Sequence, residues 1–237
     1  MPQLSVVILC YKGGRTIIPY IAQMEEDLRE GGLSDYELIL VGNYFPGMGD
    51  ETPQIIQNLA KDNPKIVPLT LEKQGMLGWD VRSGFRVATG DSIALIDGDG
   101  QMPSSDIVRL YRVLISGEFD LVKTFRKVRQ DGAYRRFISG GYNTLFRIFF
   151  PSIVFRDINS KPKLMTREAY QKMRLVCNGW FIDGEIMLES MRLNFNVAEV
   201  PTIFHANEWR GSFVKFSTIF EFLADMIWHR IKYWSKL

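Results

Sequence analysis

The feature that most constrains the fold is the alternation of short apolar runs with helical patterns over the first 126 residues. Five runs are short, continuous and rich in β-branched side chains, which is the pattern of buried parallel strands. They span residues 4–10, 36–41, 65–71, 92–96 and 120–125. With helices between them, this order predicts an α/β fold, a doubly wound and mostly parallel sheet covered on both faces. Ligands of such sheets bind beyond the carboxyl ends of the strands.

Local signals place several helix ends and the later elements. Thr52 precedes Pro53, a pattern that predicts a helix with Thr52 as its N-cap and proline in the first turn. Pro103 and the two serines after it predict the start of a second helix, which we expect to end at Gly117. After residue 126 we expect a basic loop, an aromatic-rich stretch at 142–155, strands at 163–166 and 196–201, and a helix at 184–193.

The C-terminal segment has the periodicity of an amphipathic helix. Between Phe216 and Trp234 apolar side chains recur at spacings of three and four, with Glu221, Asp225 and Lys232 on the other face. No run in the chain reaches the roughly 18 uncharged apolar residues that a membrane span needs. Tryptophan, tyrosine and lysine gather near the end of the segment, a composition suited to a bilayer interface. Docking on a membrane surface and burial in the protein core both remain open.

Composition excludes several classes of protein. An apolar content of 46% in 237 residues is enough for a substantial core. Two cysteines, Cys10 and Cys177, cannot form a disulfide framework, and with two histidines there is no zinc cluster to assemble, so we expect any metal to be held by oxygen. The N-terminal run lacks a basic segment and a cleavage site, which predicts a cytosolic protein without an export signal.

Charge divides the chain into two unlike halves. Residues 1–108 hold 8 Lys and Arg against 15 Asp and Glu, a net charge of −7, whereas residues 109–237 hold 21 against 12, a net charge of +9. A basic second half indicates phosphate groups, an anionic membrane surface or nucleic acid as a partner. Chance asymmetry on a solvated surface is the alternative interpretation.

The sharpest local motif is the pair Asp97 and Asp99, which directly follows the predicted strand at 92–96. Two carboxylates so close repel each other unless a cation lies beside them, and Mg²⁺ or Mn²⁺ fits because these ions share carboxylate oxygens with phosphates. An acidic turn that caps the next helix is the bland alternative. A calcium loop does not fit, because Met102 and Val108 occupy the positions that need glycine and an acid.

Further motifs surround this pair at characteristic spacings, and the pattern extends over almost the whole chain. The motifs are Tyr11 after the first strand, Lys73-Gln74-Gly75, Arg82-Ser83-Gly84, Ala88-Thr89-Gly90-Asp91, Asp97 to Pro103, residues 179–201, and Arg210-Gly211-Ser212. In this order they resemble family 2 glycosyltransferases, particularly polyprenyl-phosphate sugar synthases of the dolichyl-phosphate mannose synthase type.

The resemblance implies a GT-A fold that binds a nucleotide-diphosphate sugar. By that analogy residues 1–210 form the catalytic domain, with a donor half at 1–108 and an acceptor half at 109–210, and residues 211–237 form the amphipathic helix. Asp97 would help hold the donor, and Asp99 would bind the Mg²⁺ or Mn²⁺ that bridges the diphosphate. The cation would stabilise the charge that builds on the leaving group, while the acceptor attacks from the opposite face and inverts the anomeric carbon.

The resemblance also implies a set of donor-binding residues. They are Tyr11, Asn43, Lys73, Gly75, Arg82, Asp97 and Gln101. One departure concerns the segment 41–45, where the family carries an Asp-Asp-x-Ser run and this chain has Val-Gly-Asn-Tyr-Phe. The Asn43 amide could still bond a base, although the choice of base cannot be inferred. A second departure is Asn159-Ser160-Lys161-Pro162-Lys163, in place of a Ser-Gly-Phe segment.

The basic segment 123–136, with six cations and one anion, is interpreted as an acceptor-phosphate site. Arginine forks match phosphate oxygens, and the alternative is an ordinary solvated face. The residues that match the family's phosphate clamp are Arg126, Arg135 and Ser139, to which the Arg210 and Ser212 loop is added. Asp183 and Glu185 are candidates for a catalytic carboxylate; as first-turn acids they would equally suit the helix dipole.

We therefore expect an inverting, metal-dependent glycosyltransferase that moves a hexose to a polyprenyl phosphate at the cytosolic face of a membrane, as a peripheral protein. Two alternatives stay open: transfer to a saccharide or glycolipid hydroxyl, and a non-catalytic subunit that binds nucleotide sugars. Nucleic acid is not expected as a partner, because it would explain the basic half but not the aspartate pair. A dinucleotide oxidoreductase is disfavoured, since no G-x-G-x-x-G follows the first strand.

Overall fold

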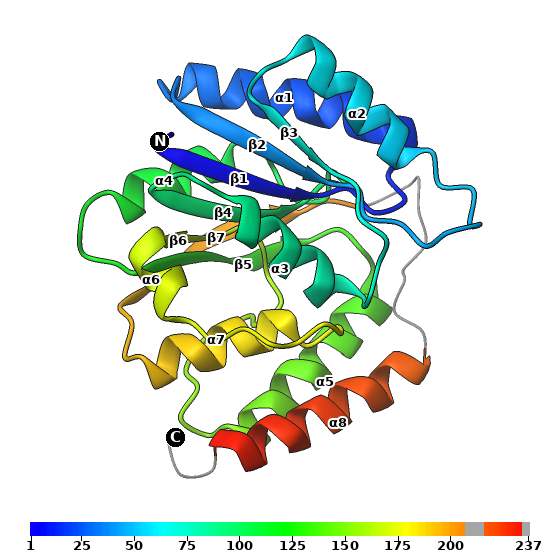
Figure 1. The fold of residues 1–237 in the computed structure, drawn as a ribbon. Coiled ribbons are helices and arrows are strands. Elements are labelled where there is room, and N and C mark those ends of the chain that lie inside the picture. The colour runs from blue at the N-terminus through cyan, green and yellow to red at the C-terminus, as the bar shows by residue number, and fades with distance from the viewer. Residues whose placement is uncertain (207–215, 234–237) are drawn as a thin grey trace.

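The computed structural model describes residues 1–206 and 216–233, apart from the side chains of 133–135, 216–219 and 232–233. Its strands are β1 (Leu4–Leu9), β2 (Tyr36–Val41), β3 (Ile66–Leu69), β4 (Ser92–Asp97), β5 (Leu121–Arg129), β6 (Lys163–Thr166) and β7 (Val197–Phe204). They form a seven-stranded sheet in the order β3-β2-β1-β4-β6-β5-β7 (Figure 1). Only β6 among these strands runs antiparallel to its neighbours, so the predicted mostly parallel sheet is confirmed.

Helices cover both faces of the sheet, as the alternation predicts. They are α1 (Ile17–Glu30), α2 (Thr52–Asp62), α3 (Leu77–Val87), α4 (Asp106–Leu114), α5 (Ala133–Phe149), α6 (Arg167–Lys172), α7 (Ile182–Arg192) and α8 (Phe216–Tyr233), with a 3-10 turn η1 at Gly14–Thr16. One buried apolar cluster joins α3, α5, α6, α7 and α8 to one face, and a second joins α1, α2 and α4 to the other. Successive β1 residues such as Val6 and Val7 enter different clusters, because side chains alternate along a strand.

Three local predictions need correction. Thr52 is the first residue of α2 rather than its cap, and the Asp50 carboxylate accepts from its N–H and O–H. Residues 103–105 form a turn, so α4 begins at Asp106 and ends at Leu114, before Gly117 with φ +84°. The expected loop after residue 126 is strand instead: β5 continues to Arg129 through an irregularity at 126–128, because β7 pairs with it in parallel.

The amphipathic helix α8 packs inward with part of its apolar side chains, whereas Phe220, Ile227 and Ile231 are exposed. Met226 is 1% exposed and belongs to the apolar cluster of that face of the sheet. The Phe222 ring lies 5.0 Å from the Tyr142 ring of α5, and the His229 ring lies 4.8 Å from Phe181. Figure 1 shows α8 beside α5 at the end of the molecule away from α1 and α2. None of the described helices is long and apolar enough to cross a membrane.

Candidate active site

The aspartate pair lies at the carboxyl edge of the sheet, between the two halves of the chain. Asp97 is the last residue of β4, which lies between β1 and β6. Gly98 donates its N–H to the Leu9 carbonyl at 2.9 Å, so the loop turns directly over the end of β1. An added Cβ at Gly98 would lie 3.0 Å from the same carbonyl. The Asp99 carboxylate accepts from the Gln101 N–H at 3.1 Å, which fixes the loop as a tight turn.

A buried lysine contacts this loop from the acceptor half. The Lys161 ammonium lies 3.4 Å from Asp97 Oδ2 and 2.9 Å from Asp183 Oδ2, and its side chain is 5% exposed. Lys163 pairs with the other carboxylate oxygen of Asp183 and donates to the Ser160 carbonyl at 2.8 Å. The structure thus joins Asp97 and Asp183, two predicted site residues, through a lysine that was not predicted as one.

The protonation states of Lys161, Lys163 and Asp183 follow from their ion pairs. Burial opposes a charged Lys161, but the attraction of Asp183 and Asp97 outweighs it and raises the pKa of Lys161. Burial prevails at Lys163 and lowers its pKa to about 8. At Asp183 the two ammonium groups outweigh burial and lower the pKa of the carboxyl. Lys161 and Asp183 are therefore a charged pair at neutral pH.

Glu185, the other catalytic candidate, holds a loop in the structure. Its side chain is 0% exposed, and its carboxylate accepts the backbone N–H groups of Val176 and Cys177 at distances from 2.8 to 3.1 Å. His229 Nε2 of α8 lies 4.0 Å from Glu185 Oε1. These contacts give Glu185 a positioning role, with the loop at 176–179 as the part that it positions.

That loop covers the start of α3 in the donor half. The Asn178 carbonyl accepts from the N–H groups of Met76 and Trp79, and a Cβ at Gly75 would lie 2.7 Å from this carbonyl. Arg82 donates to the Val176 carbonyl at 3.1 Å and to the Asn178 side chain. Gly75 and Arg82 were predicted to bind the donor, which stays a prediction, and the structure places both against this loop.

Tyr11 and Lys73 lie together at the ends of β1 and β3. The Lys73 ammonium, 1% exposed, pairs with Asp80 and lies 4.3 Å from the centroid of the Tyr11 ring. The Phe45 ring lies 6.3 Å from the Tyr11 ring and perpendicular to it. Burial lowers the pKa of Lys73 and raises the pKa of Asp80, despite their mutual attraction. An aromatic wall beside a buried cation is a surface on which a base can stack.

Asn43 is part of the same network, with its amide fully engaged inside the protein. Its Nδ2 donates to Asp80 Oδ1 at 3.0 Å and to Ser83 Oγ at 2.9 Å, and its Oδ1 accepts from the Leu71 N–H at 2.8 Å. The residue is 0% exposed. Both amide protons of Asn43 are donated within the protein, so the side chain braces the network of Asp80 and Ser83. Its contact with a base stays a prediction.

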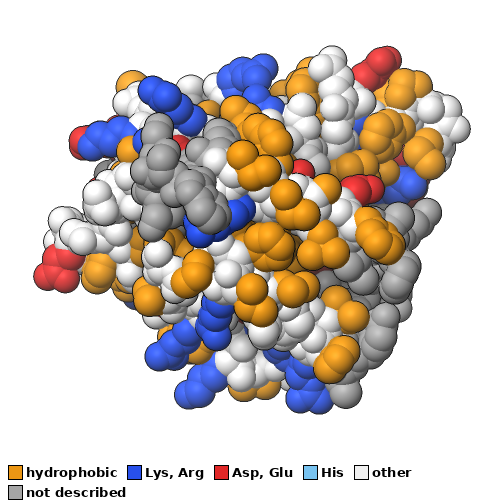
Figure 2. Space-filling view, turned by 90° about the horizontal axis from the view of Figure 1, so that it is seen from below, with side chains coloured by type: hydrophobic (Ala, Val, Ile, Leu, Met, Phe, Trp, Pro, Cys, Tyr) orange, Lys and Arg blue, Asp and Glu red, His pale blue; other side chains and the backbone are white. Residues whose placement is uncertain are grey.

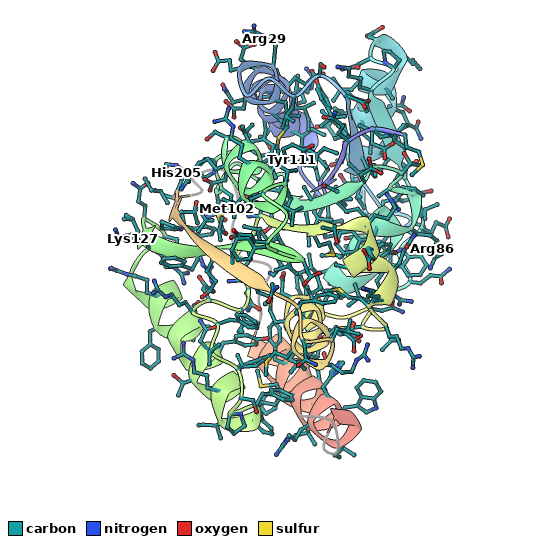
Figure 3. The ribbon with its side chains drawn as sticks, turned by 90° about the vertical axis from the view of Figure 1, so that its left-hand side faces the viewer. Arg29, Arg86, Met102, Tyr111, Lys127 and His205 are labelled. Carbon is teal, nitrogen blue, oxygen red and sulfur yellow. The ribbon has the colours of Figure 1, made fainter. Side chains whose placement is uncertain are left out.

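Gln101 connects the aspartate loop to the end of β7. Its side-chain Nε2 donates to the His205 backbone carbonyl at 2.9 Å, and the Gln101 backbone carbonyl accepts from the His205 N–H at 2.8 Å. His205 Nδ1 lies 3.2 Å from Gln130 Oε1, just after β5. Figure 3 shows His205 and Lys127 at the same side of the molecule, with Met102 next to them. The aspartate loop and the basic end of β5 therefore share one edge of the sheet.

A cavity of about 360 Å³ opens beside that basic end, between β5 and α5. Five cations and a single acid lie among its lining residues. The lining residues are Phe125, Arg126, Lys127, Arg129, Arg136, Ser139, Gly140, Asn143, Arg156 and Asp157. Lys127, Arg136 and Arg156 form no ion pair with any described carboxylate. The lining of the cavity is therefore suited to an anion.

Arg126 forms the inner wall of this cavity. Its Nε and Nη2 each lie 2.7 Å from a different oxygen of Asp157, a bidentate pair, and Nη2 also donates to Ser139 Oγ at 3.2 Å. This pairing outweighs burial and lowers the pKa of Asp157 to about 2. Arg126 and Ser139 are thus brought together as predicted. The side chain of Arg135, and Arg210 and Ser212, lie outside the described residues.

The two aspartates at the sheet edge fit a divalent cation whose other ligands come from a substrate. No group of three His, Cys, Asp or Glu side chains in the described part of the chain is arranged to hold a metal. Mg²⁺ and Mn²⁺ are often bound by one or two carboxylates together with substrate phosphates, and the pair Asp97 and Asp99 offers that number. The donor set is therefore suited to a cation that arrives with a diphosphate.

Comparison with known proteins identifies the family. Residues 5–176 match the model for glycosyl transferase family 2, and the chain belongs to this family. It is 30% identical over 206 residues to Glycosyltransferase AglD of Haloferax volcanii, covering 84% of this chain and 32% of that protein. It is 29% identical over 242 residues to Dolichol-phosphate mannosyltransferase of Pyrococcus furiosus, covering 98% of this chain and 64% of that protein. The chain thus spans from a third to under two thirds of these relatives.

Solved structures show the same fold. Glucosyl-3-phosphoglycerate synthase from Mycobacterium tuberculosis, crystallised with phosphoglyceric acid, superposes with a TM-score of 0.73 at 18% identity, over 97% of this chain and 80% of that one. A crystal of that enzyme with Mn²⁺, UDP-glucose and phosphoglyceric acid gives a TM-score of 0.67 at 20% identity, over 89% and 73%. The likeness confirms the GT-A fold predicted from the sequence motifs.

Proposed function

We propose that this chain transfers a hexose, with inversion, from a nucleotide-diphosphate sugar to the phosphate of a polyprenyl lipid. The observation that supports this most directly is the arginine-rich cavity, where five cations face one carboxylate. An ionised phosphate is the acceptor chemistry that such a lining recognises. Burial opposes a high pKa at Arg126, but Asp157 outweighs it and raises the pKa. Asp183, which pairs with Lys161 beside Asp97, adds a smaller effect in the same direction, so the cavity lies within electrostatic reach of the aspartate loop.

The names of several relatives agree with this acceptor. The Pyrococcus furiosus relative is named for dolichol phosphate. A relative from Trichomonas vaginalis, 26% identical over 84% of this chain and 64% of its own length, is a dolichyl-phosphate beta-glucosyltransferase. A relative from Pectobacterium carotovorum, 30% identical over 61% of this chain, is named for undecaprenyl phosphate. A polyprenyl phosphate is the acceptor class that these names share.

The chemistry expected of the chain's own residues is positioning rather than proton transfer. A lipid phosphate is already ionised at neutral pH, so it can attack without a general base. Arg126 and the unpaired cations of the cavity would hold it, and Tyr11 with Lys73 would hold the nucleoside. Asp99 would bind Mg²⁺ or Mn²⁺ and Asp97 would help hold the donor. Such a cation, when bound, stabilises the charge on the departing diphosphate.

A surface on α5 and α8 supports an acceptor in a membrane. Exposed apolar side chains occur on both helices, namely Phe137, Leu145 and Ile148 on α5, and Phe220, Ile227, Trp228 and Ile231 on α8. Figure 2, which looks at the molecule from this end, shows hydrophobic side chains gathered on this face, with Lys and Arg at several points of its edge and a few Asp and Glu beside them. Exposed apolar side chains with cations near them suit the interface of an anionic bilayer. We propose that this surface docks the protein peripherally, on the cytosolic face.

The proposed function is tested by product extraction. The protein is incubated with Mn²⁺, a panel of labelled nucleotide sugars and a vesicle-borne polyprenyl phosphate, and the label is followed into the organic phase. We expect transfer with one donor, release of the sugar by mild acid, and no transfer to the same polyprenol without its phosphate. Label that enters only water-soluble or glycolipid hydroxyl products would refute the acceptor, and the absence of transfer with every donor and acceptor would indicate a binding subunit.

A further inference from the structure

Lys161 is a buried cation that directly contacts the aspartate pair, and neither the motif analysis nor the relatives assign it a role. It follows β5 and α5 in the chain and belongs to the acceptor half, whereas Asp97 ends β4 of the donor half. Its Nζ is the only described side-chain cation within 4.0 Å of a carboxylate oxygen of Asp97. The contact therefore links the two halves of the chain beside the aspartate pair.

The Lys161 ammonium acts directly on Asp97 of the aspartate pair. Lys161 lies 3.4 Å from Asp97 Oδ2, whereas Asp99 is two residues further along the turn. An ammonium at this position satisfies one carboxylate oxygen of Asp97 and repels a second positive charge placed beside it. Asp183 holds the ammonium from behind at 2.9 Å, so Lys161 cannot simply swing away without leaving a buried carboxylate short of a partner.

We infer that Lys161 is a positioning residue that occupies Asp97 and so restricts the divalent cation to Asp99. This inference rests on the proposed function, because it concerns the cation that accompanies the donor. Asp97 then keeps a fixed orientation, with one of its carboxylate oxygens held by Lys161. The residue that holds Asp97 in this way is 64 positions away in the sequence.

The direct test is the affinity of the protein for Mn²⁺ alone, measured by electron paramagnetic resonance without any sugar donor or acceptor. Removing the ammonium in Lys161→Met removes the repulsion, so we expect Mn²⁺ to bind about threefold to tenfold more tightly than to the unchanged protein. Lys161→Arg keeps the charge and is expected to restore the affinity to within about twofold. Unchanged or weaker Mn²⁺ binding by folded Lys161→Met overturns the inference.

A matched control is Lys163→Met. Lys163 is equally buried and pairs with the same Asp183, but its ammonium does not bond to Asp97. We expect its Mn²⁺ affinity to stay within about twofold of the unchanged protein, because charge acts most strongly at short distance. If Lys163→Met tightens Mn²⁺ binding as much as Lys161→Met, general loss of positive charge explains the effect and the inference is wrong.

A second variant covers the case in which Lys161→Met does not fold. If Lys161 already occupies Asp97, then Asp97→Asn weakens Mn²⁺ binding by less than about threefold, whereas Asp99→Asn weakens it by tenfold or more. Equal losses in the two variants would make Asp97 a full metal ligand and overturn the inference. In the Asp97→Asn background, folded Lys161→Met is expected to lose its gain in affinity, because its partner carboxylate has gone.

Failure of this inference is separable from failure of the proposed function. The Mn²⁺ titration uses no acceptor, so a wrong assignment of the lipid leaves its result unchanged. Conversely, transfer to a polyprenyl phosphate with unchanged Mn²⁺ affinity in Lys161→Met would uphold the proposed function and reject the role of Lys161. In the transfer assay Lys161→Met is expected to raise the KM for the donor more than it lowers kcat, since Asp97 loses its fixed orientation.

Discussion

Two groups of cations lie near the carboxyl edge of the sheet, and they are neutralised in different ways. At the centre, Lys161 and Lys163 are almost completely buried, and Asp97 and Asp183 balance them one for one. At the rim, the cavity between β5 and α5 holds five cations, of which Arg126 pairs with Asp157 and Arg129 with Asp131. The other three form no ion pair with an acid among the residues that the structure describes.

The difference follows from solvent access. A buried ammonium without a partner costs several kcal/mol, so charges at the centre must be paired within the fold itself. The three rim cations without an ion pair, Lys127, Arg136 and Arg156, are exposed to water, so their charge costs little stability in the absence of an anionic ligand. The centre therefore has a fixed internal arrangement, and the rim has a positive potential directed outward. This contrast matches a rigid donor corner beside an open site for a phosphate.

The largest effect is expected from a substitution of Asp99, in the aspartate loop next to the central group of cations. If Asp99 holds the cation, Asp99→Asn lowers kcat for transfer by about 10³-fold, since removal of one preorganised electrostatic group costs roughly 10² to 10³. Initial rates at saturating donor, acceptor and Mn²⁺ measure this. The control Asp91→Asn removes an exposed carboxylate before β4, at the other end of the strand, and should change kcat less than twofold. A folded Asp99→Asn variant with a tenth of the normal rate would contradict the assignment.

The next largest effect is on stability, and it tests the pair of Arg126 and Asp157 in the cavity. The pKa of Asp157 is about 2 in the fold against an ordinary 3.8, so its pair with Arg126 stabilises the protein above pH 4 and is lost as the pH falls toward 2. Asp157→Asn should lower the free energy of unfolding by about 2 kcal/mol at pH 7, and by less at pH 3. Urea unfolding at several pH values measures this.

Its control is an exposed pair on α6. Glu168→Gln removes a contact with Lys172 in which the two side chains are 77% and 52% exposed, so the unfolding curve should not change measurably. A loss in Asp157→Asn that stayed constant from pH 7 to pH 3 would show that the carboxylate charge is not its cause.

The sequence predicted most of the fold because its signals are local. The β-branched runs at 4–10, 36–41 and 92–96 became β1, β2 and β4 almost residue for residue. The extension of β5 beyond residue 126 could not be predicted, because its basic residues resemble a loop and only pairing with β7 makes them a strand. Tertiary pairing overrode local composition there.

The site was predicted less completely, for a related reason. The aspartate loop and the neighbours Arg126 and Ser139 have local motifs, and the structure places each at the carboxyl edge or its rim. The role of Lys161 depends on a carboxylate 64 residues away, and that of Glu185 depends on backbone N–H groups of another loop. Neither leaves a local pattern, although lysines on both sides of Pro162 beside an apolar strand are a weak signal that an internal carboxylate is near.

A smaller effect is expected from the unpaired part of the rim. Arg136→Gln combined with Arg156→Gln removes two cations that no described carboxylate neutralises, so we expect the KM for the lipid phosphate to rise about tenfold while the unfolding curve stays unchanged. Steady-state kinetics with varied acceptor measure this. Arg86→Gln, an exposed arginine on another side of the molecule (Figure 3), is the matched control and should leave the KM unchanged. If the donor KM rises instead of the acceptor KM, the cavity belongs to the donor.

The smallest effect concerns the surface outside both groups of cations. Ile148 on α5 and Ile231 on α8 are 67% and 71% exposed, and neither contributes to the core. If the surface enters a bilayer interface, each change to serine should weaken binding to anionic vesicles by about threefold to fivefold, the worth of roughly 1 kcal/mol of buried apolar area. Vesicle sedimentation measures this. Ile115→Ser, 59% exposed after α4 on the opposite face of the sheet, should bind as the unchanged protein does. Equal losses in all three variants would mean that apolar exposure in general, and not the α5 and α8 surface, attracts the vesicles.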